Sequence, residues 1–75
     1  MSEQHQASEL PHLIEMANDI ARNLSFNPDA PERIADHLSR FWAPSMRRLI
    51  VAHVEAGGVG LADNAIEAVK RLDPA

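Results

Sequence analysis

The sequence predicts an all-α fold, a small single-domain bundle of about four short helices. Apolar residues recur at spacings of three and four in each long segment, which is the period of an amphipathic helix. No segment shows the sustained period-two alternation that marks a strand. Helix breakers separate the periodic segments, at Pro28, Pro44 and Gly57-Gly58. We therefore expect a flexible tail over residues 1–8 and a helical domain over residues 9–75.

The first helix is expected from Glu9 to about Leu24. Residues 1–8 (MSEQHQAS) are polar and aperiodic, as is typical of a frayed terminus. Ser8 suits the N-cap position, and Pro11 is tolerated in a first helical turn. The apolar stripe consists of Leu10, Leu13, Ile14, Ala17, Ile20, Ala21 and Leu24.

The second helix should follow a capping box formed by Asp29 and Glu32, with Pro31 in its first turn. Its end is expected at Phe41 or Trp42, because Pro44 disfavours helical geometry in the residue before it. The predicted apolar face comprises Ile34, Ala35, Leu38 and Phe41.

The third helix is expected from Pro44 to about Ala56. Gly57-Gly58 should end it, since glycine adopts the left-handed conformation without steric cost. Its apolar side would carry Met46, Leu49, Ile50, His53 and Val54. A last helix should begin at an N-cap on Asp63, with apolar residues Ala62, Ala65, Ile66, Val69 and Leu72.

Length, charge and composition exclude several classes of protein. A chain of 75 residues lies near the lower limit for independent stability, and it has no cysteine for a disulfide or a thiolate metal site. A net charge of -4 argues against nucleic-acid binding. No stretch approaches the roughly 18 apolar residues of a membrane span, and residues 1–8 do not resemble a signal peptide. We expect a soluble, cytoplasmic protein that is stabilised by helix packing or by a partner.

No catalytic, cofactor-binding or metal-ligating residue is predicted. No two histidines share the spacing that would place both imidazoles on one helix face; the four are His5, His12, His37 and His53. The glycine-bearing run at 56–61 follows a predicted helix rather than a strand and lacks the Walker lysine, so helix termination is the simpler interpretation. An autonomous enzyme is therefore not expected.

Residues 40–48 have the composition of a protein interface. They include the only tryptophan and three of the six arginines, and these residue types dominate binding hot spots. The predicted partner-binding residues are Arg40, Phe41, Trp42, Pro44, Met46, Arg47 and Arg48. Within this set, Phe41 and Met46 are expected mainly in the core. Trp42 suits core and interface equally, whereas Arg47 and Arg48 favour the interface.

Three runs resemble a known family. Residues 16–21 (MANDIA), 41–47 (FWAPSMR) and 57–61 (GGVGL) are similar to the MANxIA, FWxPxMR and GGxGL signatures of the delta subunit of NAD-dependent formate dehydrogenase. The resemblance covers roughly residues 10–72. The family commonly has an Asp-Pro pair where this chain has Ala62-Asp63, which predicts a different cap for the last helix.

The resemblance implies a place in a cytoplasmic molybdenum enzyme that oxidises formate to carbon dioxide and passes electrons to NAD. In that family the larger subunits carry bis-molybdopterin guanine dinucleotide, iron–sulfur clusters and FMN, and the delta subunit carries none. We therefore expect a non-catalytic accessory subunit that binds a larger formate dehydrogenase subunit. The alternatives are a transient maturation chaperone for molybdenum-cofactor insertion and a free-standing homodimeric helical module. Neither nucleic-acid nor membrane partners are expected.

Overall fold

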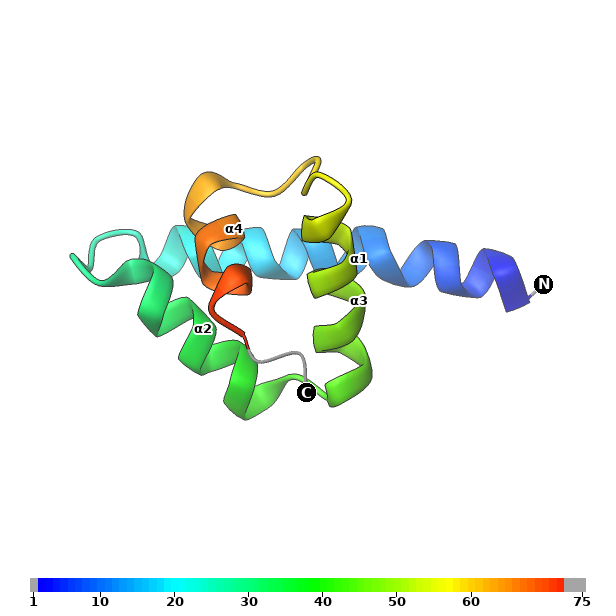
Figure 1. Ribbon diagram of the computed structural model, residues 1–75, viewed down its shortest axis with the longest axis horizontal. Coiled ribbons are helices and arrows are strands. Elements are labelled where there is room, and N and C mark those ends of the chain that lie inside the picture. The colour runs from blue at the N-terminus through cyan, green and yellow to red at the C-terminus, as the bar shows by residue number, and fades with distance from the viewer. Residues whose placement is uncertain (1, 73–75) are drawn as a thin grey trace.

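Four helices make up the part of the chain that the computed structural model describes, residues 2–72, with side chains from residue 9 onward. They are α1 (Ser2–Leu24), α2 (Ala30–Phe41), α3 (Pro44–Glu55) and α4 (Asp63–Lys70). No strand occurs between residues 2 and 72, so the all-α prediction is confirmed. Helix α1 runs the length of the molecule, and α4 lies between α2 and α3 (Figure 1). Helix α4 contacts all three other helices.

Helix α1 begins earlier than expected. It starts at Ser2, so the predicted start after an N-cap on Ser8 is wrong, and Pro11 lies inside the helix. Residues 2–8 contain neither glycine nor proline, so nothing local ends the helix there. The first turns of α1 project beyond the other helices (Figure 1). The expected flexibility of residues 1–8 stays a prediction. Residue 1 of the predicted tail and residues 73–75 of the predicted domain lie outside the residues that the structure describes.

Helix α2 begins where the sequence predicts, but it is capped differently. Asp29 occupies the N-cap position without a side-chain capping bond. Its carboxylate instead accepts a hydrogen bond from Arg33 Nε, at 2.9 Å. This bond from Arg33 holds the pKa of the Asp29 carboxyl below its ordinary value of 3.8. The capping box with Glu32 is therefore not formed, because Arg33 engages the carboxylate one turn along the helix.

The Gly57-Gly58 pair ends α3 as predicted. Gly58 N–H donates to the His53 carbonyl at 2.9 Å, and Gly57 N–H donates to the Val54 carbonyl at 3.0 Å. This pair of bonds is the Schellman pattern of a helix C-terminus. Gly58 has φ +68°, and a Cβ placed on it would lie 3.2 Å from Ile66 Cδ1. Both the backbone conformation and the packing therefore favour glycine at this position.

The core lies where α4 meets the other three helices. Its largest fully buried side chains are Leu13, Ile34, Leu38, Ile50 and Val69. The other buried hydrophobic residues are Ala17, Ala21, Ala30, Ala35, Trp42, Leu61, Ala65, Ala68 and Leu72. Complete burial of one large apolar side chain contributes roughly 1.5–3 kcal/mol, which is a large share of the net stability of so small a domain.

Phe41 is not part of this core, which corrects the predicted apolar face of α2. Its side chain is 70% exposed, whereas Trp42 is only 5% exposed. Ile34, Leu38 and Trp42 follow one another at intervals of four, on the same side as Ala35. Phe41, seven residues after Ile34, lies at one edge of that face in the last turn of α2, where its ring packs against His37 and stays open to solvent. Leu49 of α3, also expected on an apolar face, is exposed as well, at 36%.

Candidate functional site

The predicted partner-binding residues are divided between the surface and the interior at the corner where α2 meets α3. Arg40, Phe41, Pro44 and Arg48 are exposed. Trp42 is buried, and Met46 is partly buried against the core as expected. The structure thus assigns Trp42 to the core in this chain.

Arg47 joins the two helices of this corner. Its Nη1 donates to the Trp42 carbonyl at 2.6 Å and to the Ser39 carbonyl at 3.2 Å. Both carbonyls belong to the C-terminal end of α2, where acceptors lack helical partners and the helix dipole favours a cation. Pro44 begins α3 directly after Ala43, whose backbone is extended. Arg47 therefore acts as a C-terminal cap for α2 and fixes the turn into α3.

Phe41 and Arg40 form the exposed edge of the corner. The Phe41 ring contacts the His37 ring, with centroids 4.7 Å apart and planes tilted by 46°. Arg40 Nε lies 3.0 Å from an Asp36 carboxylate oxygen. Both partners come from the preceding turn of α2, so these local contacts orient the two side chains while they remain open to solvent. An exposed aromatic ring beside an oriented guanidinium suits protein recognition.

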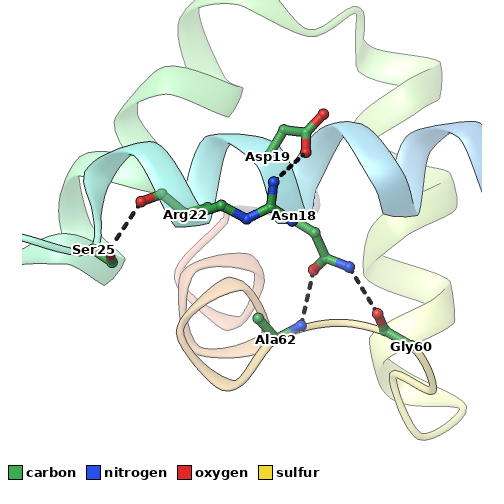
Figure 2. A network of polar contacts seen from close by, with 6 residues as sticks. All are labelled: Asn18, Asp19, Arg22, Ser25, Gly60 and Ala62. Atoms are coloured by element: carbon green, nitrogen blue, oxygen red, sulfur yellow. Dashed lines mark hydrogen bonds and ion pairs between the residues drawn. The ribbon is translucent and has the colours of Figure 1, made fainter.

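A second polar site lies on the opposite side of the fold, around Asn18 of α1 (Figure 2). Asn18 Nδ2 donates to the Gly60 carbonyl at 2.8 Å, and Asn18 Oδ1 accepts from Ala62 N–H at 2.9 Å. Ala62, not the predicted Asp63, is the N-cap residue of α4, and its methyl group offers no capping acceptor. One side-chain amide thus fixes the loop that leads into α4. Nearby, Asp19 pairs with Arg22 at 3.3 Å.

These contacts give the three signature runs a structural role. Asn18 of the first run bonds Gly60 of the third, across 42 residues of sequence. Arg47 bonds the carbonyl of Trp42 within the second run. His53 Nε2 also lies 2.7 Å from the Val59 carbonyl of the third run. Asn18 lies among polar residues of α1, and no spacing rule relates it to a distant loop. Only the resemblance singled out this residue.

Among the residues that the structure describes, no group of three or more His, Cys, Asp or Glu side chains could hold a metal ion. None of the four helices, over the residues described, combines the length and apolar character needed to cross a membrane.

Comparison with known proteins agrees with the resemblance of the three runs. Residues 12–69, which are 58 of the chain's 75 residues, match the family described as NADH-dependant formate dehydrogenase delta subunit FdsD. All three runs fall within this span. Neither the curated proteins nor the solved structures give a match. The chain therefore belongs to the delta-subunit family of NADH-dependent formate dehydrogenase.

Proposed function

We propose that this chain is a non-catalytic accessory subunit that stabilises or assembles a formate dehydrogenase by binding one of its larger subunits. Membership of the delta-subunit family supports this proposal. Under this proposal, the larger subunits of the enzyme carry the bis-molybdopterin guanine dinucleotide, the iron–sulfur clusters and FMN, and the complex is cytoplasmic. This chain would contribute binding surface.

The observation that carries the proposal is the exposure of Phe41 beside a buried Trp42. We name Arg40, Phe41, Pro44 and Arg48 the corner surface. Burying a phenylalanine side chain is worth roughly 1.5–3 kcal/mol, and a neighbouring arginine can add a charge-assisted hydrogen bond to a partner carboxylate. Trp42, Met46 and Arg47 would support this surface from below by fixing the turn between α2 and α3.

Binding of this kind would stabilise both proteins by mass action. A partner that binds only the folded state adds about 4 kcal/mol when its free concentration is a thousand times the Kd. A domain of this size has a free energy of unfolding of roughly 4–11 kcal/mol. Binding would therefore raise the stability of this chain by a large fraction, and an exposed region of the larger subunit would be protected in the same way.

The test is recovery of the assembled enzyme from the native host with tagged versions of this chain. Wild-type chain should recover the molybdenum-bearing and FMN-bearing subunits in near-equimolar amounts. Phe41→Ser should reduce that recovery without loss of helix content. Phe26→Ser is the matched control, because Phe26 is 91% exposed but lies in the turn between α1 and α2.

Three outcomes would contradict the proposal or part of it. Full recovery with Phe41→Ser would show that the corner surface does not bind the partner. Recovery of immature large subunit alone, with active enzyme purifying without this chain, would favour the transient maturation chaperone. Recovery of no larger subunit by the wild-type chain would remove the accessory-subunit proposal altogether.

A further inference from the structure

The outer face of α3 carries little charge for a surface helix. The exposed residues of α3 are Pro44, Ser45, Arg48, Leu49, Ala52 and Glu55, of which two are charged. The exposed residues of α2 are Glu32, Arg33, Asp36, Ser39, Arg40 and Phe41, of which four are charged. The two helices have the same length. The smaller number of exposed charged residues on α3 therefore reflects the composition of its outer face.

The exposed residues of α3 form one continuous stripe. Ser45, Leu49 and Ala52 follow at intervals of four and three, so they lie on one side of the helix. Serine and alanine are short, which lets a second helix approach within the 8–10 Å typical of packed helices. A hollow of about 380 Å³ lies beside this stripe, lined by Glu9, Ser45, Arg48 and Leu49. It lies between α3 and the projecting part of α1, so the stripe borders a concave surface.

Arg48 is the cation of this face, and the other exposed charge of α3, Glu55, lies at the C-terminal end of the helix. Four other arginines each pair with a carboxylate on or next to their own helix: Arg22 with Asp19, Arg33 with Asp29, Arg40 with Asp36 and Arg71 with Glu67. Arg47 is engaged by the carbonyls of α2. Among residues 9–72, Arg48 forms no ion pair. Glu9 lines the same hollow but forms no ion pair with Arg48. The guanidinium of Arg48 is therefore available to a carboxylate of another protein.

We infer that the outer face of α3, formed by Ser45, Arg48, Leu49 and Ala52, receives a helix of a larger formate dehydrogenase subunit. This inference rests on the proposed accessory function and specifies its partner. The partner helix presents an apolar stripe that covers Leu49 and Ala52, and an Asp or Glu that pairs with Arg48. Arginine binds carboxylates through two parallel hydrogen bonds, which would fix the register of the partner helix.

The experiment measures the affinity of the full-length chain for the larger subunits, purified from a host strain that lacks this chain. Arg48→Glu should weaken binding about 10- to 100-fold, because a charged hydrogen bond is lost and two carboxylates are opposed. Ala52→Trp should weaken binding to a similar extent by blocking the approach of the helix. Lys70→Glu is the matched control, since it makes the same charge change at an exposed position of α4. Circular dichroism should show wild-type helix content in all three variants.

The outcomes separate this inference from the proposal on which it rests. If Arg48→Glu and Ala52→Trp both bind with wild-type affinity while Phe41→Ser binds more weakly, the α3 face is not the docking site. The proposed accessory function would then still stand. Absence of binding by the wild-type chain would overturn both. A wild-type dimer in light scattering that Ala52→Trp converts to a monomer would instead assign the face to a second copy of this chain. If Lys70→Glu weakened binding as much as Arg48→Glu, the loss of affinity would come from the change in net charge and not from a specific contact of Arg48. That result would also contradict the inference.

Discussion

Removal of the Asn18 side chain should destabilise the fold, even though Asn18 lies on the polar side of α1. Asn18→Ala removes two hydrogen bonds, to the Gly60 carbonyl and from Ala62 N–H. Each such bond contributes roughly 0.5–1.5 kcal/mol to the free energy of unfolding. Alanine returns up to about 0.7 kcal/mol through its higher helix propensity. The expected net loss is therefore about 1–2 kcal/mol.

Urea unfolding followed by tryptophan fluorescence is a suitable assay. Trp42 is the only tryptophan and is 5% exposed, so its emission reports the loss of the core. With an m-value of about 1–1.5 kcal/mol/M for so small a domain, the urea midpoint should fall by roughly 1 M. Asn23→Ala is the matched control, because Asn23 is an exposed residue of the same helix. It isolates the propensity gain and should leave the midpoint equal or slightly higher.

One result would refute this account of the Asn18 contacts. If Asn18→Ala and Asn23→Ala unfolded at the same urea concentration, the amide bridge would contribute nothing to the stability of the fold. The loop before α4 would then be held by its other contacts, which include the burial of Leu61 and the contact of His53 Nε2 with the Val59 carbonyl.

Three further predictions concern individual side chains. Trp42→Ala should cost about 3–5 kcal/mol, because it removes a buried aromatic side chain, and far-ultraviolet circular dichroism should show a large loss of helix at 25 °C. Gly58→Ala should lower the melting temperature by several degrees, since alanine at φ +68° is strained and its Cβ would crowd Ile66. Arg33→Gln should raise the pKa of Asp29 towards its ordinary value, as followed by NMR. Because the pKa of Asp29 is lowered in the folded state, its contribution to stability is present above the unfolded-state pKa and is lost as the pH falls through the folded-state pKa.

The bounds of α2 and α3 follow from local chemistry. Pro44 is the first residue of α3, and Gly57-Gly58 ends it, as their backbone preferences predict. The start of α1 does not follow from local chemistry, because a polar segment without glycine or proline can be a tail or the exposed end of a helix. Sequence patterns identify where a helix is interrupted more securely than where an exposed end begins.

The candidate site was predicted less completely than the fold. The composition of residues 40–48 marks this corner, but it does not distinguish Phe41 from Trp42. The helix ends between these two residues, so a small change in direction decides which ring enters the core. The contact of Asn18 with Gly60 depends on how α1 packs against the loop before α4. Local sequence patterns do not predict this packing.

The order of the helices along the chain has a consequence for biosynthesis. Helix α4 is the last of the four described helices to be synthesised, yet it occupies the centre of the core and contacts the other three. Helices α2 and α3 contact each other little apart from the Arg47 bonds at their corner, so their packing also depends on α1 and α4. The corner surface and the outer face of α3 therefore acquire their final positions only when α4 has packed against the other three helices. A larger subunit that recognises both surfaces would bind chains in which α4 is packed and leave chains that lack α4 unbound.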